Sequence, residues 1–243
     1  ISKNKEQGYQ KVLAEKAKRR AEILAILFNL RDASAIPFGK ALEYANSASK
    51  ITQVTPAFIL AIITQESNLG TDQGSCYVTN MTTGAGVSSK SNRAFPNVMK
   101  PSRDIGPFTD ITLALGRDPA KTLVSCPIAS AGPSSWGGAM GPAQFIPSTW
   151  EAVQSKVAAN LGKSSANPWV ARDAIMASAT YLKDRGGVGG EVNERNAACR
   201  YYSGRACDGK KPANSFYGNS VMALARTIQA DIDYLLEYGV SRR

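Results

Sequence analysis

The sequence predicts a mainly α-helical fold. In several segments apolar residues recur at steps of three and four, the period of a helix, whereas no segment alternates with the period of a strand. With 43% hydrophobic and 20% charged positions, the 243 residues suffice for a buried core, and they contain no internal repeat.

The first segment, residues 1–33, is predicted to be a basic amphipathic helix. From Gln7 to about Arg31 its apolar positions fall on one face, and lysines and arginines occupy the rest of the circumference. This helix could pack on the domain behind it, pair in a coiled coil or lie on a membrane. Residues 34–243 are expected to form the main domain.

Capping signals place the helices of the main domain. Thr55 as N-cap and Pro56 at the first helical position open a helix over residues 57–68. Ser148 is the expected N-cap of a helix that runs toward Leu161. The other expected helices cover residues 41–49, 171–182, 196–202 and 219–238, with a turn at 186–190.

Residues 71–135 interrupt this helical pattern. They are rich in Gly, Ser, Thr, Asn and Pro, and only one short helix near Ile111 to Leu115 is expected. Long stretches of this kind inside a compact domain usually form lids or binding loops. We therefore expect inserted loops that roof a groove.

The four cysteines show neither CxxC spacing nor a histidine partner, which favours disulfides over a metal site. Of the three possible connectivities, the sequential one pairs Cys76 with Cys126 and Cys199 with Cys207, and it is favoured because the second pair closes a short loop. Disulfides predict an extracytoplasmic location, in the periplasm, at the cell surface or secreted. The chain starts at Ile1 without an export signal or a membrane span, so we expect any signal or anchor upstream.

The charge distribution and the absence of histidine narrow the function classes. Without histidine, carboxylates must carry any proton transfer. The net charge is +10, but residues 1–31 hold eight Lys/Arg against three Glu, and Arg242 and Arg243 add two more positive charges. The remaining +3 argues against nucleic-acid binding, and the basic ends suit an anionic cell wall or membrane surface.

Glu66 is the most unusual acidic residue. It continues the apolar stripe formed by Ile59, Ile62 and Ile63 on one face of the predicted helix. A carboxyl group there loses water, which raises its pKa and suits a general acid. A side chain at a helix end can equally turn toward solvent, and periodicity does not separate these two possibilities.

Two further segments contain candidate binding residues. The glycine-rich segment 137–150 includes Gln144, whose amide can bind sugar hydroxyls and acetamides, but it can also be a tight turn before a helix. Tyr201 and Tyr202 lie beside the small cysteine loop, where they could stack on sugars or belong to the core.

Three motifs carry a family resemblance when they are taken together and in order. They are Glu66-Ser67-Asn68, then Gly138-Ala139-Met140-Gly141 leading to Gln144-Phe145-Ile146-Pro147-Ser148, and Tyr201-Tyr202-Ser203-Gly204. The set resembles the lytic transglycosylases with the lysozyme-like fold, most closely the membrane-bound lytic transglycosylase B branch. The similarity covers about residues 36–235 except much of 71–135, and it implies a lysozyme-like helical domain related to goose-type lysozyme.

The resemblance implies cleavage of the β-1,4 bond between N-acetylmuramic acid and N-acetylglucosamine in peptidoglycan, leaving 1,6-anhydro ends. It assigns Glu66 as the single general acid and base, with help from the substrate's acetamide, and it requires no metal or cofactor. Ser67 and Gln144 would position the substrate or Glu66. The other implied substrate-binding residues are Met140, Phe145, Tyr201 and Tyr202. Tyr202 stands where the family pattern has Asn, which leaves open which tyrosine faces the cleft.

Two rival functions remain at this point. One is a goose-type lysozyme relative that uses water, with Asp104, Asp110 or Glu151 as a second carboxylate. The other is a non-catalytic cell-wall binding module or scaffold that holds glycan strands without cleaving them.

Overall fold

The computed structural model describes residues 36–128 and 135–238, together with positions 6, 8, 12 and 15. Apart from those four positions, the helix predicted over residues 1–33 lies outside the described residues, so it stays a prediction. No helix in the described ranges is both long and apolar enough to cross a membrane.

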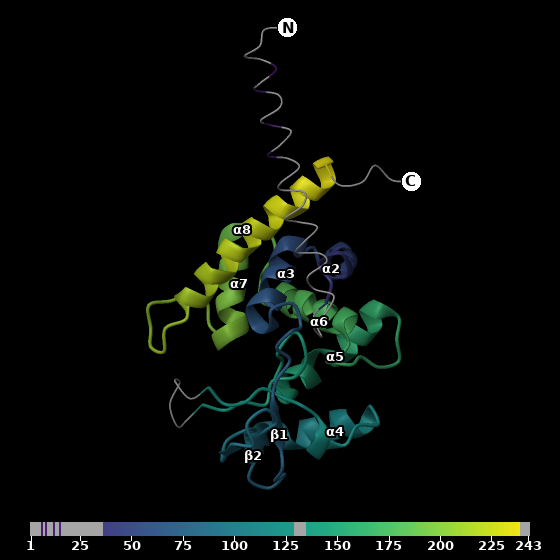
Figure 1. Ribbon diagram of the computed structural model, residues 1–243, viewed down its shortest axis with the longest axis vertical. Helices are drawn as coiled ribbons and strands as arrows, with labels where there is room; N and C mark the ends of the chain where they lie inside the picture. The colour runs from purple at the N-terminus through teal and green to yellow at the C-terminus, as the bar shows by residue number, and fades with distance from the viewer. Residues whose placement is uncertain are drawn as a thin grey trace.

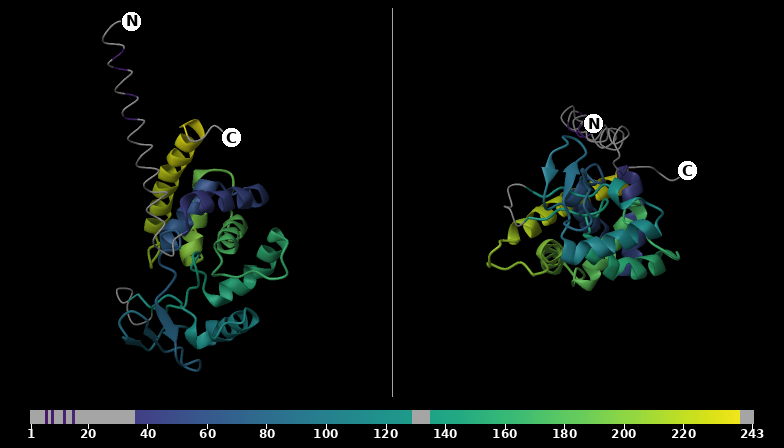
Figure 2. Two further views of the ribbon diagram at one scale, coloured as in Figure 1. Left: turned by 45° about the vertical axis from the view of Figure 1, so that its right-hand side comes forward. Right: turned by 90° about the horizontal axis from the view of Figure 1, so that it is seen from below.

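The described chain is mainly helical, as predicted (Figure 1). Six of the helices in the described ranges form a body that contains most of the core. A smaller part lies below this body in both upright views (Figures 1 and 2). The helices of the body are α2 (Phe38–Thr52), α3 (Pro56–Ser67), α5 (Pro147–Leu161), α6 (Ala171–Asp184), α7 (Glu191–Ser203) and α8 (Ser215–Tyr238).

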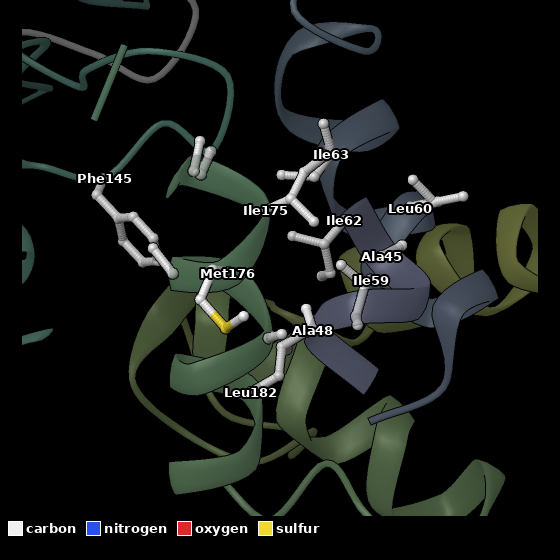
Figure 3. Close-up of a cluster of buried hydrophobic side chains, with 14 of the residues drawn as sticks. Ala45, Ala48, Ile59, Leu60, Ile62, Ile63, Phe145, Ile175, Met176 and Leu182 are labelled. Atoms are coloured by element: carbon white, nitrogen blue, oxygen red, sulfur yellow. The ribbon is translucent and has the colours of Figure 1, made fainter. Parts of the chain in front are cut away.

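Helix α3 forms the centre of the body. Pro56 occupies its first turn, and every residue from Ala57 to Ile63 is buried. It packs against α8, α2 and α6, and Ile62 and Ile63 lie close to Ile175 of α6 (Figure 3). A helix buried on all sides has no solvent face, so the core fixes both its position and its rotation.

Several helices begin at positions that differ from the prediction, among them α2, which starts at Phe38 rather than at residue 41. Helix α5 starts at Pro147, and Ser148 does not cap it: its hydroxyl donates to Asp104 at 2.8 Å. Helix α7 starts at Glu191 rather than at residue 196, directly after the predicted turn. Helix α8 starts at Ser215 rather than at residue 219. The first turn of α7 is mostly polar, and Gly218 interrupts the first turn of α8, which hides these starts in the sequence.

The insertion contains more regular structure than the predicted loops. Strands β1 (Cys76–Val78), β2 (Gly86–Ser88) and β3 (Ala94–Phe95) form an antiparallel sheet in sequential order. The expected short helix is present as α4 (Gly106–Ala114), which a helical turn at Pro101–Ile105 precedes. The expectation of no strands was therefore wrong, because strands of two or three residues are too short to show alternation.

Both predicted disulfides are confirmed. Cys76 and Cys126 are bonded at 2.01 Å, and this bond ties β1 to the chain that returns to the body. Cys76 also exchanges two backbone hydrogen bonds of 2.9 Å with Val124. Cys199 and Cys207 are bonded at 2.05 Å and close the loop after α7.

Candidate active site

Glu66 lies in the last turn of α3, beside a hollow that we call the inner pocket. Its carboxyl group is partly buried, and burial raises its pKa from 4.5 to about 7, against the lowering effect of a hydrogen bond from Tyr217. Helix α3 ends directly after Ser67, since Asn68 adopts a left-handed conformation with φ of 49°. The apolar core thus holds the carboxyl group at the edge of the body.

Two hollows meet at Glu66 and Gln144. The inner pocket has a volume of about 190 Å³ and is lined by Glu66, Gln144, Phe145, Ile146, Thr149, Tyr181, Tyr201 and Tyr202. The outer groove has a volume of about 550 Å³ and extends between the body and the insertion. It is lined by Glu66, Thr71, Asp72, Gly74, Ser75, Lys90, Ser125, Cys126, Ile128 and Gln144. Residues from all three sequence motifs therefore surround one continuous space.

Gln144 reaches this space from a loop with an unusual backbone. Its φ is 52°, a left-handed value that side-chain-bearing residues seldom adopt. The side-chain Nε2 donates to the carbonyl of Gly141 at 2.7 Å, which fixes the plane of the amide. Such conformations concentrate at functional sites.

Ser67 and Met140 support the site from beneath. Ser67 is 1% exposed, and its hydroxyl donates to the carbonyl of Pro142 at 2.6 Å and accepts from the N–H of Gly70 at 2.9 Å. Met140 is fully buried and its backbone N–H donates to the carbonyl of Phe145 at 2.9 Å. The Ser67–Pro142 bond joins the end of α3 to the glycine-rich segment, and the Met140–Phe145 bond lies within that segment. Neither side chain lines the two hollows.

The two adjacent tyrosines of α7 occupy different depths. The hydroxyl of Tyr201 donates to the carbonyl of Ala143 at 2.7 Å and lies 3.1 Å from that of Ser178. Burial, and then the charge of Glu66, raises the pKa of Tyr201 well above its usual value, so it stays protonated. Tyr202 is 52% exposed and lies at the rim. Both tyrosines line the inner pocket.

Tyr217 is a site residue that the sequence reasoning missed. Its hydroxyl donates a hydrogen bond to Oε1 of Glu66 from the first turn of α8. Burial, followed by the charge of Glu66, raises the pKa of Tyr217 well above its usual value, so the hydroxyl keeps its proton. The ring of Tyr202 stacks on that of Tyr217 with centroids 4.9 Å apart.

The second disulfide positions Tyr217. A Cβ atom on the neighbouring Gly218 would lie 2.6 Å from Sγ of Cys199 and 2.8 Å from Sγ of Cys207, so only glycine allows the first turn of α8 to approach the disulfide this closely. The sequence gives no motif for Tyr217, and only its proximity to the small cysteine loop could have drawn attention to it.

The profile of one protein family, described as the transglycosylase SLT domain, matches residues 38–226. The chain belongs to this family. The match includes Glu66, the glycine-rich segment, both tyrosines of α7 and Tyr217. No curated protein sequence matches the chain.

Three solved structures share the fold of this transglycosylase SLT domain. The first is described as a 36 kDa muramidase/transglycosylase, with a TM-score of 0.53 and 16% identity over 78% of this chain and 71% of that one. The Escherichia coli lytic transglycosylase Slt35 in complex with bulgecin A matches with a TM-score of 0.52 and 16% identity over 78% and 70%. Slt35 in complex with calcium gives 0.51 and 15% over 93% and 88%. These matches confirm the predicted lysozyme-like fold of the lytic transglycosylases.

The other acidic residues considered from the sequence lie outside both hollows of the transglycosylase domain. Asp104 is fully buried and binds Arg103 at 2.6 Å and Ser148. Asp110 and Glu151 line neither hollow. Instead, the structure places Asp72 in the outer groove. Within the described ranges, no group of three or more His, Cys, Asp or Glu side chains is arranged to hold a metal ion.

Proposed function

We propose that this transglycosylase domain cleaves the β-1,4 bond between N-acetylmuramic acid and N-acetylglucosamine in peptidoglycan and leaves 1,6-anhydro ends. The observation that carries the proposal is the environment of Glu66: a carboxyl group with a pKa of about 7, facing a pocket in which no other described carboxylate lies. A group of this pKa can both give and accept a proton near neutral pH.

The reaction follows from the two states of Glu66. The protonated carboxyl group donates its proton to the glycosidic oxygen as the bond between this oxygen and C1 of the muramoyl residue breaks. The carboxylate then removes the proton from the C6 hydroxyl, whose oxygen forms the new bond to C1. The substrate's acetamide stabilises C1 between the two steps. One carboxyl group is thus regenerated without water as acceptor.

The surrounding residues support this cycle in different ways. Gln144, with its fixed amide, would hydrogen-bond the sugar, and Tyr202 would offer a ring face to it, while Phe145, only 3% exposed, would form part of the pocket wall. Tyr201 would bound the pocket floor, and Ser67 and Met140 would hold the loop that presents Gln144. Tyr217 would orient Glu66, because its hydroxyl donates a hydrogen bond to the carboxyl group.

A second candidate function is hydrolysis by water. Asp72 lines the outer groove together with Glu66, so a second carboxylate is present in the same space. Glycosidases that use water place two carboxyl groups about 5–9.5 Å apart. Product masses separate the two reactions, because anhydro ends are lighter by one water than reducing ends. Asp72→Asn should leave cleavage intact under our proposal and abolish it under the rival.

The partners and the location follow from the same proposal. The binding partners are peptidoglycan glycan strands, and nucleic acid is not among them. The two disulfides and a cell-wall substrate support an extracytoplasmic location. Association with a membrane or the cell envelope through residues 1–33 or an upstream segment is part of this proposal.

The deciding experiment is digestion of purified peptidoglycan by the full chain and by Glu66→Gln. Loss of the acid should reduce turnover by at least about a thousandfold. Glu194→Gln is the matched control, since Glu194 is also buried, with a pKa raised by burial and an acceptor bond of 2.7 Å from Thr55, but it lies outside both hollows. Retained turnover in a folded Glu66→Gln variant, or binding without turnover by the parent, would reject the proposal.

The stability of Glu66→Gln verifies that the variant is folded. The folded-state pKa of Glu66 is raised, so its contribution to stability is fully present below pH 4.5 and is lost as the pH rises to about 7. Because glutamine does not ionise, the Glu66→Gln variant does not lose stability as the pH rises. It should match the parent at pH 4 and exceed its free energy of unfolding at pH 8 by up to about 3 kcal/mol.

A further inference from the structure

A third hollow lies on the far side of the segment that leads out of α3. It has a volume of about 340 Å³, within the range of small-ligand sites. Its walls come from residues 70–74, from β1, from the end of the insertion and from the connection between α5 and α6. We call it the side pocket, and Glu66 is not among its lining residues.

The side pocket is positively charged. Among the described residues, Arg117 and Lys121 are the only charged ones that line it, and no carboxylate does. Lys121 lies 3.4 Å from Asp118, whereas Arg117 has no carboxylate within ion-pair distance in the described part of the chain. The guanidinium of Arg117 stacks on the ring of Trp169, 4.6 Å from its centroid. Stacking fixes the plane of the guanidinium and leaves its N–H edges for a carboxylate.

The remaining walls suit a short peptide. The indole of Trp169 is held by a hydrogen bond from its Nε1 to the carbonyl of Leu123 at 3.4 Å, so a flat apolar wall stands beside the cation. The Nε2 of Gln73 donates a hydrogen bond to the carbonyl of Gly70 at 2.9 Å. The side-chain oxygen of Gln73 can therefore accept a hydrogen bond from a peptide N–H. The ring of Tyr77 completes the lining.

The side pocket and the outer groove share a wall. Thr71 and Gly74 line both hollows. A Cβ atom on Gly74, whose φ is 115°, would lie 2.3 Å from the backbone of Val124, so the start of the insertion packs directly against its end. The two spaces are therefore separated by a single stretch of backbone. A peptide of four residues spans about 13 Å when extended, enough to cross it.

We propose that the side pocket binds the terminal carboxylate of a peptidoglycan stem peptide whose glycan strand lies in the groove. This inference rests on the proposed function, because the stem peptide reaches the pocket from a muramoyl residue bound near Glu66. The Arg117 guanidinium binds the carboxylate through two parallel N–H bonds, and Trp169 packs against the last side chain. The side pocket then makes cleavage sensitive to the stem peptide.

The first test compares cleavage of glycan strands with stem peptides and of strands stripped of peptides by an amidase. The parent should prefer the peptide-bearing strands, and Arg117→Ala should lower the ratio of the two kcat/KM values about tenfold. Arg117→Lys keeps the charge without the planar fork and should give an intermediate ratio. Arg93→Ala is the matched control: Arg93 also stacks on an aromatic ring of the insertion, that of Phe95, but it does not line the pocket.

A second measurement does not depend on turnover. Trp169 reports binding through tryptophan fluorescence when a free stem tetrapeptide is titrated into the full-length Glu66→Gln protein. The emission change should occur with a free C-terminal carboxylate, weaken about tenfold after C-terminal amidation and disappear with Arg117→Ala. An unchanged cleavage ratio in Arg117→Ala, or equal binding of both peptides, would overturn this inference. Absence of cleavage of both strands by the parent would instead contradict the proposed function.

Discussion

The helical body and the insertion use different means to hold their residues in place. In the body, α3 is buried from Ala57 to Ile63, and its apolar contacts fix the position of the helix that bears Glu66. The insertion has few buried apolar side chains; those described are Cys76, Val78, Val98, Met99, Phe108, Ile111 and Val124. The disulfide from Cys76 to Cys126 and close backbone contacts hold it together. The body thus sets the chemistry, whereas the insertion sets the shape of the groove around it.

Truncation of the core should have the largest effect on stability. Phe58 is fully buried in α3, and Phe58→Ala should lower the global free energy of unfolding by about 4 kcal/mol because it leaves a cavity at the centre of the body. Denaturant unfolding measures this loss. Leu236→Ala, at a position that is 80% exposed, serves as the control and should change it by less than about 0.5 kcal/mol. Similar losses for both variants would contradict a body held by apolar burial.

Removal of the first disulfide should have a smaller effect that is confined to the insertion. The Cys76→Ala/Cys126→Ala variant releases a loop of some fifty residues, at an expected cost of about 3 kcal/mol. Amide hydrogen exchange should accelerate at Tyr77 and Val87 of the sheet but remain slow at Ile62 of α3. Acceleration throughout α3 would show that the two regions unfold as one unit.

Removal of the hydrogen bond from Tyr217 should have the smallest effect, because this bond changes only the pKa of Glu66. Burial raises the pKa of Glu66 to about 7 and the Tyr217 hydroxyl lowers it, so Tyr217→Phe should raise it further. The proton donor must be protonated, so kcat/KM falls above this pKa. The falling limb of the pH profile should therefore move to higher pH, by about one unit or less.

The control for this measurement is Tyr44→Phe, since Tyr44 lies on α2 and outside both hollows. Its pH profile should coincide with that of the parent. A Tyr217→Phe profile that stays in place or moves to lower pH would mean that the hydroxyl does not control the ionisation of Glu66.

Much of the helical body could be predicted from the sequence, because apolar periodicity and caps depend on neighbours along one helix. Glu66 stood out for the same reason, since its apolar neighbours precede it by three to seven positions. The short strands could not be predicted, because their pairing partners lie in other segments and their two or three residues show no pattern of their own. The start of α7 was hidden in a mostly polar turn, and that of α8 in a turn that contains Gly218.

The candidate site shows the same division. The sequence placed Glu66, Gln144, Phe145 and both tyrosines of α7 together only through a family resemblance, and the structure gathers them around the inner pocket. The sequence alone did not distinguish the buried Tyr201 from the exposed Tyr202. That difference arises because successive residues of a helix point in different directions, and only the packing of α7 determines which one faces inward.

The sequence by itself determined the helical class, and it favoured an apolar setting for Glu66 and the sequential pairing of the cysteines, because each of these depends on residue spacing and local chemistry. Only the tertiary structure decided that Tyr217 reaches Glu66 across 151 positions, that Ser67 binds the Pro142 carbonyl, and that Arg117 lies over Trp169. These contacts join segments that share no local pattern. They form because the buried body and the cross-linked insertion bring distant parts of the chain to the same place.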